Sequence, residues 1–460
     1  MQFSFYGAAQ TVTGSKHIIT LDNGRRILLD CGMFQGKGQK NEDLNSELPF
    51  KPESIDYLIL SHAHIDHCGL IPFLVKSGFS GPIFATPPTL ALARLLLEDS
   101  AGIQLSQSRS NGNSEVTEPL FTIEDVEASL ALFKTVPYNK RFAIDENIEL
   151  LFTDAGHILG SAVVNLTVTE GSRTTQVAFT GDIGRFNNRI LNPPQEFPQA
   201  DVIICESTYG NKLHESIENT EQRLLHIVEQ TCVEKGGKLL IPAFSVGRTQ
   251  ELIFSLNKLA EDGLLPEIEV FVDSPLSVYA TDIMRENQKF FNESMQEYIE
   301  SDPDPFGFPR LHFITETDDS KQLNYFDKPC VIISASGMME GGRIRHHLRN
   351  NISDERNTIL ITGYCEPSTL GGRISNGAQE VLIMGEKYSV KAEVMFMNEY
   401  SAHADYGDLL KLLIRQNQEK VKQIFLVHGE KTVMAEFKNT LMENGFKNVE
   451  IAEFRMSYEV

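Results

Sequence analysis

The chain has 460 residues and carries 41 Lys and Arg against 63 Asp and Glu, so its formal net charge is −22. Hydrophobic residues at 41% and charged residues at 23% exclude a disordered or fibrous chain, and the length predicts roughly two to four domains. A protein that holds nucleic acid mainly by neutralising phosphates is expected to be basic, so a nucleic-acid role here needs a local patch or bound cations.

Short strands dominate the first part of the chain. Apolar segments joined by glycine turns, including an Asn23-Gly24 hairpin signal, favour strands over helices. The predicted strands cover residues 3–10, 16–22, 25–32, 55–61, 148–156 and 175–182. A helix is expected over 69–78 and a polar surface loop over 106–120. We therefore predict an α+β or sandwich-like N-terminal domain of many strands.

A different pattern begins at about Asp201, where apolar strands alternate with longer helical segments. Such alternation is typical of a doubly wound, mostly parallel sheet, which predicts a second domain. Its strands are predicted at 201–208, 238–244, 267–275, 329–337 and 357–365. After about Lys391 a polar turn at 400–408 leads into a helix, the strand 422–429, a further helix and a last strand.

The cysteines and the first residues indicate the compartment. Six cysteines are scattered without a C-x-x-C pair, which fits neither a disulfide framework nor a zinc finger and favours a reducing environment. The first residues lack a basic region followed by an apolar run, and no window approaches about 18 uninterrupted apolar residues. We expect a cytoplasmic protein without a secretory leader or membrane contact.

The segment SHAHIDH gathers potential metal ligands. It contains His62, His64 and His67, with Asp66 between them, although the whole chain has only 12 histidines. Two residues apart at the end of the strand 55–61, His62 and His64 point to the same side, and Asp66 and His67 turn into the next helix. Imidazole and carboxylate suit Zn(II), Mn(II) or Fe(II). The alternative, polar residues that merely end a strand, fits one histidine better than four ligand-type residues.

Further candidates also follow apolar strands. Asp30, His157, Asp182 and His428 each stand at or just after such a strand. The carboxyl ends of neighbouring strands converge on one rim, so distant residues can share a site there. Taken singly, an Asp before Gly is more often a turn residue. The remaining histidines, among them His17 and His347, belong to no ligand pattern and are expected on surfaces or helix faces.

With these residues the sequence resembles the metallo-β-lactamase fold and its two-metal centre. The resemblance rests on SHAHIDHCG, on the strand-end Asp30, and on the G-H and G-D pairs that contain His157 and Asp182. It implies an αββα sandwich. Proteins of this fold bind a pair of metal ions at these positions, and we expect the same in this chain.

Three later motifs resemble the β-CASP branch of that fold, whose nucleases include the pre-mRNA 3′-end processing endonuclease and smaller bacterial and archaeal relatives. These motifs are ESTYG from Glu206, SAHAD around His403 and HGE from His428. The segments IPAFSVGRTQE, SASGMMEGGR and TGYCEPSTLGGR resemble the inserted domain of that branch. A histidine at the last motif is typical of its RNA-acting members.

The resemblance implies an α/β protein, a metallo-β-lactamase αββα sandwich with an inserted, doubly wound α/β β-CASP domain. The expected boundaries are 1–205 for the first part of the sandwich, 206–390 for the β-CASP domain and 391–460 for the return of the sandwich. The N-terminal KH modules and the long C-terminal extension of some relatives have no counterpart here, so we expect no RNA recruitment by such parts.

The same resemblance implies two Zn²⁺ per chain, with Mn²⁺ or Fe²⁺ as alternatives. Each metal would have three protein ligands of its own, and Asp182 would bridge the pair. Asp30 would accept a hydrogen bond from a ligand imidazole and fix its tautomer. The implied ligand sets are His62, His64 and His157 for one metal, and Asp66, His67 and His428 for the other.

The implied reaction is hydrolysis of RNA by a water activated at the two metals, which leaves 3′-hydroxyl and 5′-phosphate ends. Asp66, His403 and Glu206 would be the catalytic residues, with His403 giving a proton to the leaving 3′-oxygen and Glu206 keeping it protonated. The alternative for Glu206 is a turn or helix-cap residue.

The expected partner is single-stranded RNA, and a homodimer is one of the oligomeric states left open. Ser245, Arg248, Arg343 and Ser401 are candidates for phosphate contact, although the glycine-rich segment before Arg343 also fits a plain strand-to-helix turn. Phe34 is a candidate for stacking on a base, with a core phenylalanine as the alternative.

Two other functions use the same motifs. A small-molecule hydrolase, such as a thioesterase or lactamase, would need the histidine centre but not a domain inserted between Asp182 and His428. An inactive RNA-binding scaffold would not need every candidate ligand, yet every one is present. Turnover of a thioester or β-lactam would favour the first alternative, and failure to retain metal would favour the second.

Overall fold

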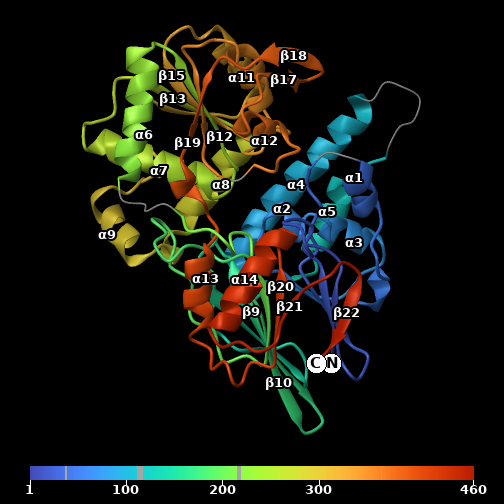
Figure 1. Cartoon of the computed structure of the whole chain (residues 1–460). Coiled ribbons are helices and arrows are strands. Elements are labelled where there is room, and N and C mark those ends of the chain that lie inside the picture. The colour runs from blue at the N-terminus through green and yellow to red at the C-terminus, as the bar shows by residue number, and fades with distance from the viewer. Residues whose placement is uncertain (37–38, 111–117, 215–218, 364) are drawn as a thin grey trace. The chain divides into compact units, whose positions relative to one another are not determined.

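The computed structural model describes residues 1–36, 39–110, 118–214, 219–363 and 365–460. By their contacts they form two units, one made of Met1–Leu213 and His403–Val460, the other of His214–Ala402 (Figure 1). The first unit is thus discontinuous in sequence, and its C-terminal segment returns after the second unit.

One sheet of the first unit has seven strands in the order β22-β1-β2-β3-β4-β5-β6. From β22 to β3 the strands are antiparallel, and from β3 to β6 they are parallel. The strands are β1 (Gln2–Phe5), β2 (His17–Thr20), β3 (Arg26–Leu29), β4 (Tyr57–Ile59), β5 (Ile83–Ala85), β6 (Phe133–Thr135) and β22 (Met456–Glu459).

The second sheet of this unit also has seven strands, in the order β21-β20-β11-β10-β9-β8-β7. Its strands β10, β11, β20 and β21 are parallel neighbours, so their carboxyl ends lie at one edge. The strands are β7 (Phe142–Ala143), β8 (Ile148–Asp154), β9 (Ala162–Glu170), β10 (Arg173–Phe179), β11 (Val202–Glu206), β20 (Gln423–Val427) and β21 (Val449–Ile451).

The main core lies between the two sheets, because alternate residues of each strand face inward. Phe3 and Phe5 of β1 pack against Phe425 of β20, with ring centroids 5.6 and 5.0 Å apart. A second cluster packs Leu409 of α13 and Phe437 of α14 on the outer face of the second sheet. The helices of this unit are α1 (Gln39–Ser46), α2 (Ile65–Cys68), α3 (Ile71–Lys76), α4 (Pro87–Ser110), α5 (Ile123–Leu130), α13 (Tyr406–Leu413) and α14 (Lys431–Glu443).

The second unit is built on a six-stranded sheet in the order β14-β13-β15-β12-β16-β19, and every pair in it is parallel. An antiparallel hairpin of β17 (Glu380–Ile383) and β18 (Glu386–Ser389) stands apart from it. The six strands are β12 (Lys238–Pro242), β13 (Glu269–Asp273), β14 (Leu311–Ile314), β15 (Cys330–Ser334), β16 (Thr358–Ile361) and β19 (Glu393–Phe396).

Helices join these parallel strands, as crossover connections require. The predicted αββα sandwich with an inserted, doubly wound α/β domain is therefore confirmed. The helices are α6 (Thr220–Val228), α7 (Arg248–Glu261), α8 (Pro275–Glu286), α9 (Glu293–Ser301), α10 (Thr317–Gln322), α11 (Ile344–Asn351) and α12 (Leu370–Ser375), with a π-helical turn at Glu229–Glu234 after α6.

Two segments differ from the sequence expectation. The polar segment 106–120 was expected to be a loop, but α4 continues to Ser110; residues 111–117 of that segment lie outside the described residues. Strand β19 lies beyond residue 390, and it pairs with β16 in the sheet of the second unit. Tyr364 of the TGYCEPSTLGGR motif also lies outside the described residues.

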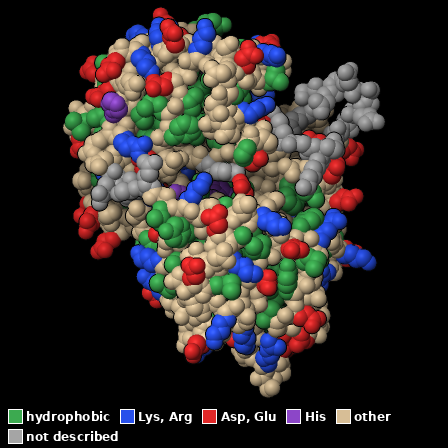
Figure 2. All heavy atoms as spheres, viewed as in Figure 1, with side chains coloured by type: hydrophobic (Ala, Val, Ile, Leu, Met, Phe, Trp, Pro, Cys, Tyr) green, Lys and Arg blue, Asp and Glu red, His purple; other side chains and the backbone are tan. Residues whose placement is uncertain are grey.

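The charges are spread over both units. On the face that Figure 2 views, Lys and Arg side chains are interspersed with Asp and Glu side chains. No helix among the described residues has the length and the apolar composition needed to cross a membrane.

Candidate metal centre

The SHAHIDH segment forms the turn between β4 and α2. His62 and His64 follow the strand, and His64 is the residue that precedes the first turn of α2. Asp66 and His67 lie inside that turn, where the His67 amide donates to the His64 carbonyl at 2.9 Å. His62 and His64 fall in one group of candidate ligands and Asp66 and His67 in another, although the ring centroids of His62 and His67 lie only 4.0 Å apart.

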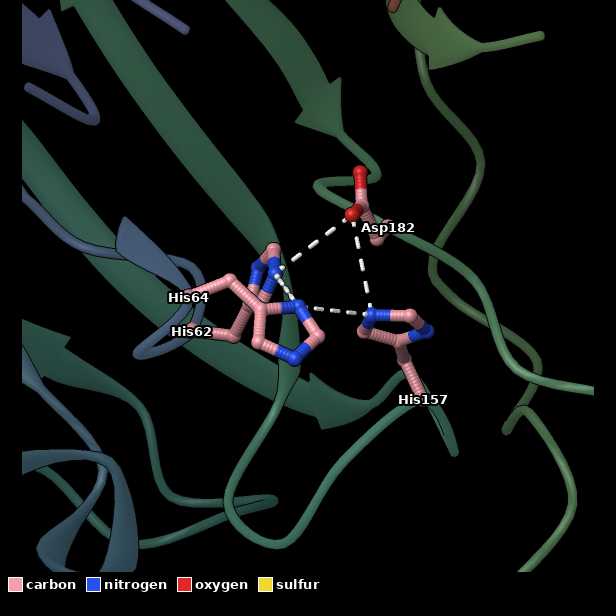
Figure 3. A group of neighbouring side chains, drawn as sticks. All are labelled: His62, His64, His157 and Asp182. Atoms are coloured by element: carbon pink, nitrogen blue, oxygen red, sulfur yellow. Dashed lines mark hydrogen bonds and ion pairs between the residues drawn. The ribbon is translucent and has the colours of Figure 1, made fainter. Parts of the chain in front are cut away.

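One group of candidate ligands gathers His62, His64, His157 and Asp182, whose ligand atoms all lie within 4.8 Å of one another. Figure 3 shows the three imidazoles and the carboxylate pointing toward one another. The His64 Nδ1 atom lies 3.2 Å from Nε2 of His62 and 3.1 Å from Nε2 of His157. The Asp182 Oδ2 atom lies 3.4 and 3.6 Å from the same two Nε2 atoms.

A second group contains Asp66, His67 and His428. The His428 Nε2 atom lies 3.4 Å from His67 Nε2 and 3.5 Å from Asp66 Oδ2. The other oxygen of Asp182, Oδ1, lies 3.4 Å from His67 Nε2. Asp182 therefore stands between the two groups, with one oxygen toward each.

Backbone turns at the strand ends place two of these residues. His428 follows β20 with a φ of 51°, and its amide donates to the carbonyl of Ala8 at 2.6 Å. Asp30 follows β3 with a φ of 58°. Both are left-handed conformations that a non-glycine residue adopts at a cost, which the surrounding hydrogen bonds offset.

The buried carboxylate of Asp30 holds the His67 ring. It accepts from the Ser61 amide at 2.8 Å, from the Ser61 hydroxyl at 2.9 Å and from His67 Nδ1 at 2.6 Å. With its Nδ1–H bound to Asp30, the neutral His67 ring has its free lone pair on Nε2, the atom that faces Asp182. Asp30 thus lies where a residue that fixes the tautomer of a ligand would lie.

In the first group, the pKa values of His62 and His64 favour neutral imidazole rings, the form that binds a metal ion. Burial lowers the pKa of His62 to about 3 and that of His64 to about 4, so both rings are neutral at pH 7. Burial opposes the charged form of His67, but Asp182 and Asp30 raise its pKa well above the ordinary value. Binding of a cation at this histidine would therefore release a proton.

The donor set fits divalent cations. Burial alone would raise the pKa of Asp182, but His428, His67 and His62 hold it well below its usual range, so the carboxylate is charged. Its Oδ1 atom is buried and accepts no hydrogen bond from any described residue. A buried anionic oxygen without a hydrogen bond, ringed by imidazole nitrogens, is an arrangement that a bound cation satisfies.

A third group lies beside the first two and contains Asp182, Glu206 and His403. The fully buried carboxylate of Glu206 accepts from the Ile183 amide at 2.5 Å and lies 3.3 Å from His403 Nδ1. Burial lowers the pKa of His403, but Glu206, together with Asp182, raises it to about 9. This histidine is therefore protonated at neutral pH in the absence of bound cations.

The four candidates for phosphate contact all lie in the second unit. Ser245 is buried with its hydroxyl 3.4 Å from that of Ser274, and the buried Arg248 opens α7. Arg343 donates through Nη1 to Asp273 Oδ1 at 2.7 Å and through Nη2 to the Thr315 carbonyl at 2.6 Å. Ser401 is buried after the turn Asn398–Tyr400.

Phe34 is 8% exposed and its ring is already in contact on several sides. The Lys16 ammonium lies 4.4 Å from the ring centroid, and the Phe454 ring packs against its edge at 6.3 Å. A Cβ atom at Gly14 would come within 2.7 Å of the ring. This is the surrounding of a core phenylalanine, the alternative to base stacking.

The sequence misplaces one histidine and misses one hydroxyl. His17 was expected on a surface or a helix face but is buried in β2. His347 lies on a helix face, one of the two expected places, and this face is buried, with His347 Nε2 2.6 Å from Asp273 Oδ2. The burial of His347 could have been predicted from its position on the apolar side of α11, since that side faces the core. Thr208, in the ESTYG motif, touches both Glu206 and His428; nothing in its residue type distinguishes it from a turn threonine.

Models of three protein families match the chain. A metallo-beta-lactamase superfamily domain matches residues 18–196, and a Beta-Casp domain matches residues 249–374. The model described as a Zn-dependent metallo-hydrolase RNA specificity domain matches residues 387–452. The three matches follow one another along the chain in the order that the sequence resemblance implies.

Curated proteins are similar over nearly the full length. Ribonuclease TTHA0252 of Thermus thermophilus is 35% identical over 451 residues, which cover 98% of this chain and 97% of that protein. Transcription termination factor FttA of Methanocaldococcus jannaschii is 31% identical over 450 residues, or 96% of this chain and 69% of that protein. An RNase J-like protein of the same organism is 31% identical over 441 residues, with 95% and 94% covered. The sandwich carries histidine groups near its strand ends, and these relatives match the chain along its length. The chain therefore belongs to the β-CASP family of metallo-β-lactamase-fold hydrolases.

Proposed function

We propose that this chain is a metal-dependent ribonuclease that hydrolyses phosphodiester bonds of single-stranded RNA and leaves 3′-hydroxyl and 5′-phosphate ends. The observation that carries the proposal is Asp182, which faces one ligand group with each of its oxygens and has His403 beside it at 3.9 Å. The names of the relatives, two of which are ribonuclease or RNase J-like, and the RNA specificity domain support RNA as the substrate.

The metal ligands would be the seven residues of the first two groups. Zinc is our choice for both ions, because imidazole and carboxylate are ligands that it favours, with Mn²⁺ or Fe²⁺ as alternatives. Two bound cations would supply a water of lowered pKa as nucleophile and would neutralise charge on the phosphoryl oxygens. The proposed ligands are His62, His64 and His157 for one ion, and Asp66, His67 and His428 for the other, with Asp182 shared.

The leaving 3′-oxygen needs a proton, and His403 would provide it. Its ring lies within 3.9 Å of Asp182 and 3.3 Å of Glu206, and it is one-fifth exposed, so a substrate can reach it. Glu206 is fixed by the Ile183 amide and cannot follow the ring, so it orients the imidazole as well as keeping it charged.

The cysteines bear on the compartment. All six are free, and five of them are buried. Burial raises the pKa of the Cys31 and Cys232 thiols to about 12, so these groups are unreactive thiols rather than thiolates. Free thiols support a reducing location, and we propose the cytoplasm.

The test of the function uses zinc-loaded protein, 5′-labelled single-stranded RNA and DNA of the same sequence. We expect RNA to be cut and DNA to be cut far more slowly, with 3′-hydroxyl ends that a poly(A) polymerase can extend. Ends that carry a 2′,3′-cyclic phosphate would contradict a water nucleophile. Turnover of a thioester or β-lactam without RNA cleavage would replace the proposal with a small-molecule hydrolase, and failure of the purified protein to retain metal, without any turnover, would favour a scaffold.

Glu206→Gln is expected to move the alkaline limb of the pH–rate profile to lower pH. Protonated His403 is the active form, so the rate falls as pH rises through its pKa, which the Glu206 charge raises. Without that charge the pKa falls, by about 1 to 3 units for a neighbour this close. Cleavage rates measured from about pH 6 to pH 10 report the limb. An unmoved limb would mean that another group sets it.

Asp30→Asn is expected to weaken zinc binding by about 10- to 100-fold, the usual effect of losing a partner of a ligand histidine. Both carboxylate oxygens of Asp30 accept hydrogen bonds, from Ser61 and His67, whereas an amide has only one acceptor oxygen. Competition with a chromophoric chelator measures the affinity. Asp145→Asn is the matched control, since Asp145 also accepts several hydrogen bonds but lies outside the ligand groups. Equal losses in both variants would contradict a specific role of Asp30.

A further inference from the structure

The Thr208 hydroxyl lies between two parts of the centre. Thr208 follows β11, two residues after Glu206. Its Oγ1 atom lies 2.6 Å from Glu206 Oε2 on one side and 3.0 Å from His428 Nδ1 on the other. One hydroxyl thus touches both the carboxylate beside His403 and a candidate metal ligand.

The directions of these hydrogen bonds follow from the groups themselves. An ionised carboxylate only accepts, so the single hydroxyl proton of Thr208 goes to Glu206, in the shorter and charge-assisted contact. The hydroxyl oxygen is then an acceptor for the His428 tautomer that carries its proton on Nδ1, an atom that also lies 3.4 Å from Asp182 Oδ1. In that tautomer the lone pair of His428 is on Nε2, the atom that faces His67 and Asp66.

The backbone around Thr208 keeps the hydroxyl in this place. Glu206 and Val427 are partners in the parallel pair of β11 and β20, so the residues that follow each strand leave the sheet together. The Ser207 hydroxyl donates to the Val427 carbonyl at 2.7 Å. At Gly429 a Cβ atom would come within 2.6 Å of that hydroxyl, so glycine is what allows the two segments to lie this close.

We propose that Thr208 is a positioning residue that serves both halves of the reaction. It fixes the tautomer and the ring orientation of His428 for metal binding, and it holds the Glu206 carboxylate toward His403. The proposal rests on the proposed function for its second half only, because the effect on metal binding needs no RNA. Since a single hydroxyl makes both contacts, its removal has to impair metal binding and proton donation together.

The test compares Thr208→Val with Thr208→Ser. Valine keeps the shape and removes the hydroxyl, and serine keeps the hydroxyl. Zinc affinity of the weaker site, measured by chelator competition, is expected to fall about 10- to 100-fold in the valine variant and to return to within about threefold of the unchanged protein in the serine variant. Equal affinities in the valine variant and the unchanged protein would overturn the first half of the proposal.

A matched control distinguishes a specific effect of the Thr208 hydroxyl from a general effect of removing a buried threonine hydroxyl. Thr231→Val removes a buried threonine hydroxyl of the second unit, which donates to Thr358 Oγ1 at 2.8 Å. It should leave zinc affinity unchanged; a loss as large as that of Thr208→Val would overturn the proposal. At saturating zinc, RNA cleavage by Thr208→Val should remain at least about tenfold below that of Thr208→Ser. Equal cleavage rates of the two variants at saturating zinc would overturn the role of Thr208 in holding Glu206. The zinc titration would still decide whether Thr208 positions His428.

Discussion

Replacing His403 with alanine should lower the rate of RNA cleavage by about 100- to 10,000-fold, the range that a lost general acid or base costs. The departing 3′-oxygen would then leave without a proton. Zinc content should not change, because His403 lies 3.9 Å from Asp182 and outside the two ligand groups. Single-turnover rates with saturating enzyme, together with zinc analysis of the purified variant, measure both quantities.

A substrate with sulfur in place of the bridging 3′-oxygen sharpens this test. A thiolate leaves without prior protonation, so the unchanged protein and His403→Ala should cleave it at similar rates. A defect that persists on the sulfur substrate would assign His403 to another step. Loss of zinc would make it a ligand in the third group, with Asp182 and Glu206. His312→Ala, which removes a histidine paired with Glu269 in the second unit, is the matched control.

Replacing Asp182 with asparagine should abolish binding of at least one of the two ions and reduce cleavage by about 1,000-fold or more. Several kcal/mol of transition-state stabilisation depend on the ions, and about 4 kcal/mol corresponds to a factor of about 1,000. An amide is neutral and offers one oxygen, whereas each oxygen of Asp182 faces a different ligand group. Zinc analysis after gel filtration and single-turnover cleavage report the two effects.

Thermal unfolding adds a measurement that is independent of activity. Ions that bind only the folded protein stabilise it, so a chelator should lower the melting temperature of the unchanged protein and have little effect on Asp182→Asn. Asp201→Asn is the matched control, since Asp201 accepts from the Gln176 amide and pairs with Lys422 away from the ligand groups. A chelator shift in Asp182→Asn as large as in the unchanged protein would contradict the shared position of this carboxylate.

The candidate centre could be predicted largely because its residues follow a positional rule. Asp30, Glu206 and His428 lie at or directly after the end of a strand, and His62 and Asp182 lie three residues beyond one. Apolar strands are easy to read from a sequence. Parallel neighbours then bring the ends of β10, β11 and β20 to one edge of the sheet. The histidine spacing indicated metal-binding chemistry, and the division into ligand sets came from the family resemblance.

The features that were missed depend on side chains that meet only in three dimensions. For Phe34 the sequence left a core position and base stacking both open, and its burial depends on contacts with Gly14 and Lys16, which lie on another segment of the chain. The pairing of His347 with Asp273 joins α11 to the end of β13, 74 residues earlier. Strand β19 is short and only partly buried, so its pairing with β16 has no strong periodic signal. Position along a strand can be read from sequence, and contact between segments cannot.

The order in which the strands are used has a consequence for synthesis. Strand β20, whose end carries His428, pairs with β11, and all of His214–Ala402 lies between them in the chain. Strand β22 likewise pairs with β1. Domains usually fold in sequence as they leave the ribosome, but here the first unit has to wait until the second has been made. A chain whose translation stops before residue 428 therefore lacks His428, a member of the second ligand group, and cannot form a complete centre.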